Sequence, residues 1–198
     1  VHEAADHVKL MNRLTAKTIG VKPAARTTCV KPAGTTSLVL GTSSGIHAWH
    51  NKYYIRRMRV GKNEAIYKYL AMNHPELIED EYFRPHDTAV IEIPQSAPKG
   101  SIVRTESAFD LLDRVKKIAT EWVKPGHKSG SNTHNVSATI SLKEKEWDKA
   151  SEWMWENRDN YNGLSVLPYD GGTYTQAPFE DITKTKYDEM SKALQNID

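Results

Sequence analysis

The sequence has very little cysteine, and this scarcity limits the chemistry open to it. Cys29 is the single cysteine among 198 residues, so the chain can form no internal disulfide. A chain without disulfides is typical of a reducing compartment, which predicts a cytoplasmic location. Zinc sites need several thiol or imidazole ligands at fixed spacing. His47 and His50 stand three residues apart with no second cysteine nearby, so no metal site is predicted.

Long hydrophobic runs and an excess of one charge are also missing. No stretch reaches the roughly 18 consecutive apolar residues of a membrane-spanning helix, and the opening "VHEAADHVKLMNRL" lacks the apolar centre of a secretion signal. The 27 Lys and Arg residues nearly balance the 25 Asp and Glu residues. This balance predicts neither nucleic acid nor a membrane as a partner. Because no initiator Met precedes Val1 and the first residues already have a helical pattern, we expect a fragment or one part of a larger protein.

The chain is rich instead in alternating helical and strand patterns. Apolar spacing predicts helices over residues 2–19, 63–73, 107–123, 143–157 and 183–194, and strands over 53–60, 88–94, 135–142 and 163–168. Such alternation predicts an α/β protein with at least partly parallel strands. No repeat, low-complexity segment or linker divides the sequence. We therefore expect residues 1–198 to form a single domain or a fragment of one.

The turn "KPAGTTS", residues 31–37, has the composition of a phosphate-binding loop. Gly34 allows a ligand to approach the backbone closely, and hydroxyl groups at the start of a helix add donors to amides that already favour an anion. The spacing is not that of a Walker A loop, because Lys31 precedes the turn. An ordinary Pro-Gly turn followed by helix capping accounts for the same residues. The pattern alone leaves both interpretations open.

Three other features favour a structural interpretation. Cys29 lies in a short β-prone run at residues 27–30, where a buried thiol is more typical than a nucleophile. Arg56, Arg57 and Arg59 in "YYIRRMR" match a strand with one solvated face better than a phosphate clamp. The five tryptophans mostly stand at helical spacings, which predicts that they belong to the core.

Four motifs occur in order along the chain: "TTCVKPAGTTSLVLGTSSGIHAWHNKYYIRRMRV", "NTHNVSATISL", "NGLSVLPYDGG" and "TYTQAPFEDIT". Together they resemble the C-terminal part of the large, catalytic chain of ribonucleotide reductases, in the adenosylcobalamin-dependent (class II) type, over residues 1–182. The resemblance implies an α/β fold, the C-terminal part of the ten-stranded α/β barrel of ribonucleotide reductases. It also implies conversion of ribonucleotides to deoxyribonucleotides, used in DNA replication, by thiyl-radical chemistry with adenosylcobalamin.

The resemblance assigns the substrate-phosphate contacts to the turn, namely Ala33, Gly34, Thr35, Thr36 and Ser37. The family's reaction needs at least three thiols, and Cys29 is the only one in this sequence. In the family, a glutamate closely follows the cysteine of the finger loop, but here Lys31 stands two residues after Cys29. We therefore expect no catalytic residue in this chain, which should be inactive alone. The implied partners are a ribonucleotide substrate, the missing N-terminal part of the catalytic chain and a thioredoxin-like reductant.

The type within the family is inferred from "GLSVLP". Class I large chains carry adjacent tyrosines in the matching strand as a radical relay from a small subunit, whereas Ser165, Val166 and Leu167 occupy it here. Alternatives are a class I large chain with a diverged relay, a non-catalytic nucleotide- or phosphate-binding module, and one half of a split enzyme. The sequence does not distinguish a diphosphate from a triphosphate substrate.

Overall fold

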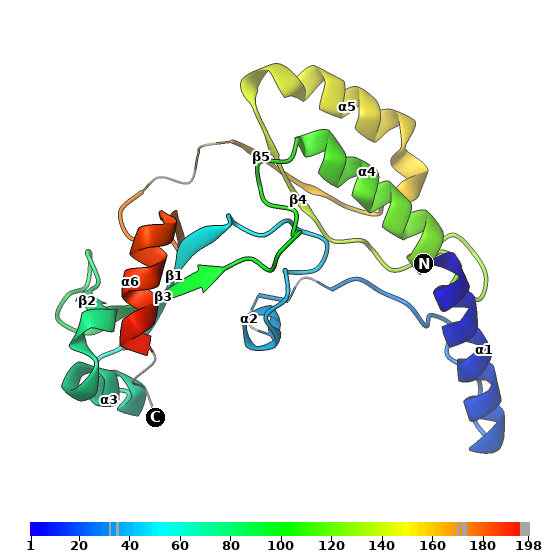
Figure 1. Ribbon diagram of the computed structural model, residues 1–198. Helices are drawn as coiled ribbons and strands as arrows, with labels where there is room; N and C mark the ends of the chain where they lie inside the picture. The colour runs from blue at the N-terminus through cyan, green and yellow to red at the C-terminus, as the bar shows by residue number, and fades with distance from the viewer. Residues whose placement is uncertain (32, 35, 170, 172–173, 195–198) are drawn as a thin grey trace. The chain divides into compact units, whose positions relative to one another are not determined.

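The computed structural model describes residues 1–31, 33–34, 36–169, 171 and 174–194 of the chain (Figure 1). The chain divides into two compact units. The first contains Val1–Ala48 and Glu106–Tyr169, and the second contains Trp49–Thr105 and Asp170–Asp198. Because two compact units can belong to one domain, the expectation of a single domain or fragment stays a prediction.

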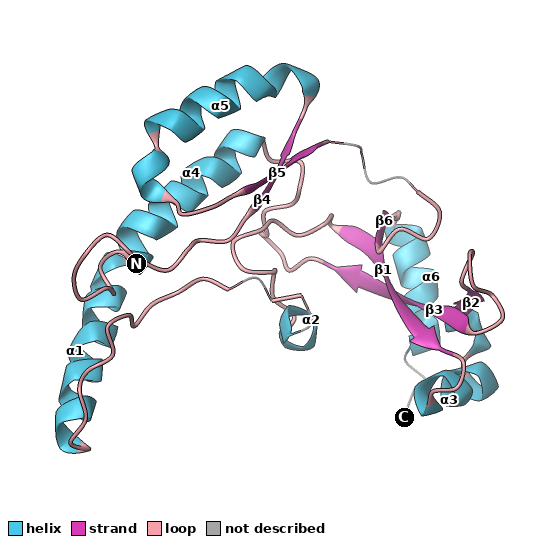
Figure 2. Cartoon of the chain, turned by 180° about the vertical axis from the view of Figure 1, so that it is seen from behind, coloured by secondary structure: helices cyan, strands magenta, loops and turns pink. Residues whose placement is uncertain are grey.

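The first unit combines helices with a pair of parallel strands. Its helices are α1 (His2–Thr18), α2 (Thr36–Leu40), α4 (Ala108–Ile118) and α5 (Trp147–Glu156), and short helical turns cover Ala119–Val123, Glu144–Glu146 and Arg158–Asn160. Its strands are β4 (Thr139–Leu142) and β5 (Ser165–Pro168), which pair in parallel (Figure 2). The expected parallel pairing is therefore present in this unit.

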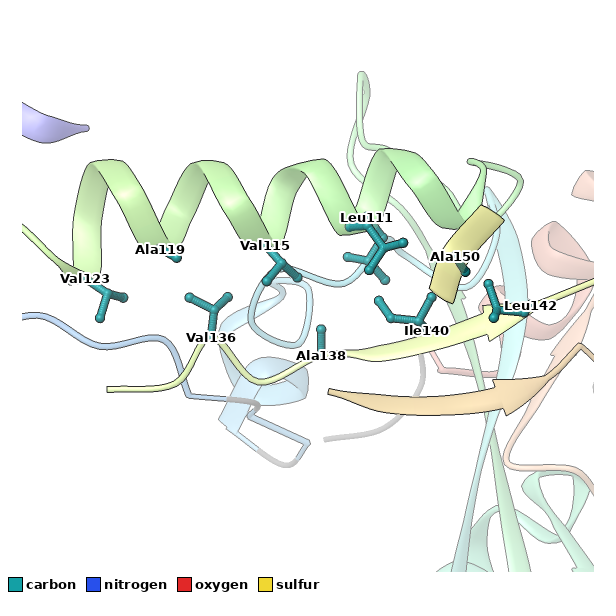
Figure 3. Close-up of a cluster of buried hydrophobic side chains, with 10 residues drawn as sticks. Leu111, Val115, Ala119, Val123, Val136, Ala138, Ile140, Leu142 and Ala150 are labelled. Carbon is teal, nitrogen blue, oxygen red and sulfur yellow. The ribbon is translucent and has the colours of Figure 1, made fainter. Parts of the chain in front are cut away.

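The core of the first unit lies between α4 and the segment that contains β4. A capping box formed by Ser107 and Asp110 starts α4, which satisfies backbone donors that the first helical turn leaves free. Apolar residues three and four apart then line one face of the helix. Figure 3 shows these side chains meeting those of the β4 segment; the buried set is Leu111, Leu112, Val115, Ala119, Val123, Val136, Ala138, Ile140, Leu142 and Ala150.

The second unit is built on a four-stranded antiparallel sheet. The strand order is β2 (Ile78–Asp80), β3 (Thr88–Ser96), β1 (Tyr53–Gly61) and β6 (Phe179–Asp181). Helices α3 (Ala65–Asn73) and α6 (Lys184–Leu194) and the turn Pro75–Leu77 complete the unit. Its small core consists of Val60, Leu70, Ala89 and Ile91. The sequence patterns indicated β1 and β3 but missed β2 and β6, since three residues are too few for an alternating pattern.

Three predicted strand boundaries are wrong. The strand expected over residues 135–142 begins only at Thr139, and the strand expected over residues 163–168 begins only at Ser165. The strand expected to stop at Pro94 continues to Ser96, with Pro94 opposite Ile55 in the ladder. In the part of the chain that the structure describes, no helix is long and apolar enough to cross a membrane.

Candidate functional site

The candidate site is the turn that leads into α2, the place where the sequence predicts phosphate contacts. Gly34 and Thr36 are exposed, and α2 begins at Thr36. Ser37 is buried, with 6% of its surface exposed. Pro32 and the predicted contact residue Thr35 lie outside the described residues.

Hydrogen bonds hold the turn from inside. The hydroxyl of Ser37 donates to the carbonyl of Gly34 at 3.4 Å, and its amide donates to the carbonyl of Ala33 at 3.3 Å. The amide of Ala33 donates to the hydroxyl oxygen of Ser44 at 3.2 Å. Ala33 and Ser37 therefore fix the shape of the turn, while Gly34 and Thr36 present exposed surface.

The loop at residues 44–47, which supports the turn, is anchored by His47. The Nδ1 atom of His47 lies 2.8 Å from the carbonyl oxygen of Ser44, and its Nε2 atom lies 3.0 Å from the amide nitrogen of Thr139. Because an amide can only donate, Nε2 must accept, and Nδ1 must carry the proton donated to Ser44. The two contacts therefore assign His47 as the neutral Nδ1–H tautomer.

A second anchor joins the same loop to α4. The guanidinium group of Arg114 donates to the carbonyl of Ile46 at 2.9 Å and is paired with the carboxylate of Glu106. The Ile46 side chain packs against the core of the first unit. The loop is thus fixed on one side by a helix and on the other by the start of β4.

The segment that enters the turn is positioned by Thr28. Its hydroxyl donates to the carbonyl of Trp122 at 2.6 Å, and its side chain packs very close to Gly126. A Cβ atom added at Gly126 would lie 1.9 Å from the Thr28 hydroxyl oxygen, so only glycine fits there. The indole of Trp122 also donates to the carbonyl of Cys29 at 3.1 Å.

Two expectations about this unit are wrong. Cys29 is exposed rather than buried, because its neighbour Thr28 points inward to its hydrogen-bond partners. Trp147 and Trp155 lie at the surface rather than in the core, with exposed fractions of 41% and 71%. Both stand on α5, whose helical spacing puts one side of the helix toward solvent.

Asn135 was not singled out from the sequence, yet it orders the loop before β5. Its side-chain oxygen accepts hydrogen bonds from the amides of Asn162 and Gly163, both at 3.2 Å. Its side-chain amide donates to the carbonyl of Gly163 at 2.9 Å. The motifs "NTHNVSATISL" and "NGLSVLPYDGG" therefore meet through Asn135, which sets the start of the parallel strand pair.

A basic hollow of about 320 Å³ is a second place in the first unit that can attract an anion. Its cationic side chains are Lys9 and Arg13 of α1 and Lys128. Asn12, also in its lining, exchanges two hydrogen bonds of 3.3 Å with the backbone of Ala24. More than 100 positions separate Lys128 from the other two cations, so the sequence pattern gave no sign of this hollow.

In the second unit, Arg57 serves the protein's own structure. Its guanidinium group lies 2.6 Å from a carboxylate oxygen of Glu92 and 2.6 Å from one of Glu180, and only 9% of its side chain is exposed. The guanidinium carbon of Arg56 lies 4.2 Å from the ring centre of Phe179, and Arg59 pairs with Glu81 at 3.3 Å. The strand prediction for this segment is confirmed, but the prediction that Arg57 lies on a solvated face of the strand is wrong.

The motif "TYTQAPFEDIT" contributes a structural clamp through Gln176. Its side-chain amide donates to Glu79 at 2.9 Å and to the carbonyl of Asp80 at 2.8 Å, and its oxygen accepts from the amide of Tyr82 at 2.9 Å. Gln176 has a φ angle of 55°, a left-handed conformation that costs energy for a residue with a Cβ atom. The three hydrogen bonds offset that cost and tie the loop to β2.

His50 lies near a carboxylate in the second unit. Its Nε2 atom is 3.0 Å from Asp181, although the two are not aligned for a hydrogen bond, and its ring stacks on Phe179. Burial lowers the pKa of His50 to about 4, and the nearby Arg104 adds to the effect. Across the described residues, no group of three or more His, Cys, Asp or Glu side chains is placed to hold a metal ion.

The comparisons with known proteins give one consistent result. No protein-family model matches the chain. It is 28% identical over 177 residues to an adenosylcobalamin-dependent ribonucleoside-triphosphate reductase of Levilactobacillus brevis, which covers 89% of this chain and 23% of the relative. It is 30% identical over 182 residues to the enzyme of that name from Euglena gracilis, covering 88% of this chain and 23% of the relative.

The fold comparison agrees. A crystal structure of a B12-dependent (class II) ribonucleotide reductase matches with a TM-score of 0.78 and 24% identity, over 98% of this chain and 27% of that chain. The chain therefore spans about a quarter of the length of the proteins it matches. The predicted resemblance to class II ribonucleotide reductases is confirmed. The predicted α/β fold class is also confirmed, and this chain matches only part of the larger α/β fold.

Proposed function

We propose that this chain is part of an adenosylcobalamin-dependent ribonucleotide reductase, in which it binds the phosphate groups of the substrate. The complete protein would convert ribonucleotides to deoxyribonucleotides for DNA replication, in the cytoplasm. The similarity to reductases of this type over nearly nine-tenths of the chain supports the proposal. The absence of adjacent tyrosines at residues 165–167 supports class II over a class I large chain.

The proposed phosphate contacts are the residues of the turn, Ala33, Gly34, Thr35, Thr36 and Ser37. The observation that carries this assignment is the division of roles within the turn, which supports direct contacts for Gly34 and Thr36 and a shaping role for Ala33 and Ser37. Ala33 and Ser37 are held by internal hydrogen bonds, whereas Gly34 and Thr36 are exposed at the start of α2. A fixed turn with exposed backbone and hydroxyl groups suits an anion, because little order has to be gained on binding.

The radical chemistry is assigned to the rest of the enzyme. Adenosylcobalamin would supply the radical in the complete enzyme. The single thiol, Cys29, cannot provide the several cysteines that the reaction requires. We therefore propose that this chain alone is inactive and needs the remaining part of the catalytic chain and a thioredoxin-like reductant.

The first test is calorimetric titration of the chain with a ribonucleoside triphosphate. Gly34→Val is the most informative variant, since a Cβ atom at Gly34 meets no protein atom within 4 Å. A loss of binding would then report the close approach of the ligand rather than a clash within the protein. Thr36→Ala should also weaken binding, and the exposed Thr42→Ala in the same segment is the matched control.

A variant of the basic hollow distinguishes the main alternative. If Arg13→Ala with Lys128→Ala abolishes binding while Gly34→Val does not, the phosphate binds in the hollow, which favours a non-catalytic phosphate-binding module. In the complete protein, reduction that depends on adenosylcobalamin and needs no small subunit would separate class II from class I. A separate polypeptide carrying the missing thiols would identify a split enzyme.

A further inference from the structure

His47 occupies a position between the turn and the parallel strands, although it is not among the predicted phosphate contacts. Its ring is about half-buried, and both nitrogens are engaged, Nδ1 with the carbonyl of Ser44 and Nε2 with the amide of Thr139. The amide of His47 also donates to the carbonyl of Ser44 at 3.1 Å. One side chain thus joins the start of β4 to a residue that holds the turn.

Ser44 links His47 to the turn through hydrogen bonds. Its carbonyl accepts both bonds from His47, while its hydroxyl accepts the amide of Ala33 at 3.2 Å. The path therefore runs from Thr139 through His47 and Ser44 to Ala33, entirely within the first unit. Ala33 immediately precedes the exposed Gly34, so the position of Ser44 sets where the exposed backbone of the turn begins.

We propose that His47 is a positioning residue for the phosphate-binding turn, acting through Ser44 and anchored by Thr139. The inference rests on the proposed phosphate-binding function of the turn and assigns that function a supporting residue. The ring is suited to this role because its two nitrogens lie on opposite sides, which lets one side chain accept from β4 and donate to the loop. The hydrogen bond that one ring nitrogen makes also sets which nitrogen carries the proton.

The two bonds of His47 can be separated by substitution. Asn places its side-chain amide near the position of Nδ1 and keeps the donor to Ser44, whereas Gln places its amide near Nε2 and keeps the acceptor for Thr139. We expect His47→Asn and His47→Gln each to weaken triphosphate binding, and His47→Ala to weaken it roughly tenfold, the effect of losing one or two hydrogen bonds. The exposed His134→Ala in the same unit is the matched control.

A coupling measurement distinguishes positioning from a general loss of stability. Ser44→Ala removes the bond to Ala33 but leaves the Ser44 carbonyl in place. If His47 acts through Ser44, then His47→Ala should reduce affinity far less in the Ser44→Ala background than in the wild type. Additive losses, or an unchanged dissociation constant in a folded His47→Ala variant, would overturn the proposal.

Two spectroscopic readouts keep the test independent of ligand binding. Nitrogen-15 NMR of the ring should show the Nδ1–H tautomer, and exchange of the Ala33 amide with solvent should be faster in His47→Ala than in His134→Ala. If the wild type binds no triphosphate, the proposed function of the turn fails, and Ala33 exchange alone decides this inference. Unchanged Ala33 exchange would then refute it, whereas faster exchange would support the structural link.

Discussion

Replacing Gly126 by alanine should destabilise the first unit, because its backbone packs directly against Thr28. The added Cβ atom would lie 1.9 Å from the Thr28 hydroxyl oxygen and 2.7 Å from each of two Thr28 carbons. Real atoms do not approach so closely, so Thr28 must move and lose its 2.6 Å bond to the carbonyl of Trp122. Overpacking typically costs about 1–3 kcal/mol, and a lost buried hydrogen bond about 1 kcal/mol.

The expected loss is therefore about 2–4 kcal/mol in the free energy of unfolding, which corresponds to roughly 5–15 °C in the melting temperature for a chain of this size. Tryptophan fluorescence is a suitable probe, since four of the five tryptophans lie in the first unit. Gly163→Ala is the control, because a Cβ atom there meets nothing within 4 Å.

A second substitution tests the proposed contact directly. Thr28→Ala removes the hydroxyl and methyl groups that the new Cβ atom would meet but leaves the Thr28 Cβ atom at 2.7 Å. Adding it to Gly126→Ala should therefore cost less than Thr28→Ala costs alone in the wild type. If Gly126→Ala is as stable as Gly163→Ala, or if the two substitutions are additive, the packing argument is wrong.

Three further predictions concern partly buried polar groups. Arg57→Met should destabilise the second unit by about 2–3 kcal/mol, because Glu92 and Glu180 lose their shared cation. Urea unfolding followed by circular dichroism measures this loss. A loss no larger than that of Arg57→Lys would contradict the prediction. Because burial depresses the pKa of His50 from 6.5 to about 4, the unfolded chain binds more protons between these values, and stability should fall as the pH decreases from 6.5 to 4. His50→Gln should remove that part of the pH dependence, and identical profiles would exclude His50 as its source. Asn135→Asp keeps the acceptor but loses the donor to the loop before β5, so we expect a loss of about 1–2 kcal/mol in thermal unfolding, whereas a gain would show that the donor is dispensable.

The long elements could be predicted from the sequence because their periodic patterns extend over several turns or strand repeats. Helix α1 and strand β1 lie close to the predicted residues. Strands β2 and β6 escaped because each has three residues and depends on pairing with a neighbour. The exposure of Cys29 was misjudged because a single sequence does not show which of two adjacent residues, Thr28 or Cys29, faces inward.

The candidate site was only partly accessible to sequence reasoning. Glycine and hydroxyl composition located the turn, since these residues act locally on its backbone. The role of His47 depends on a hydrogen bond to Thr139, 92 positions away, and no local pattern encodes such a partner. Likewise, Arg57 had two plausible environments until the antiparallel pairing of β1 with β3 and β6 placed Glu92 and Glu180 beside it.

The assembly of the first unit from two separated stretches of chain has a consequence for its biosynthesis. Ala33 and Ser44 emerge from the ribosome before Thr139, which follows His47 by 92 residues. At typical elongation rates of about 5–20 residues per second, this interval lasts roughly 5–20 seconds. During that time the nascent turn can close its internal bonds but has no strand to fix it, so its final shape is acquired late, after the intervening antiparallel strands β1 and β3 have been made.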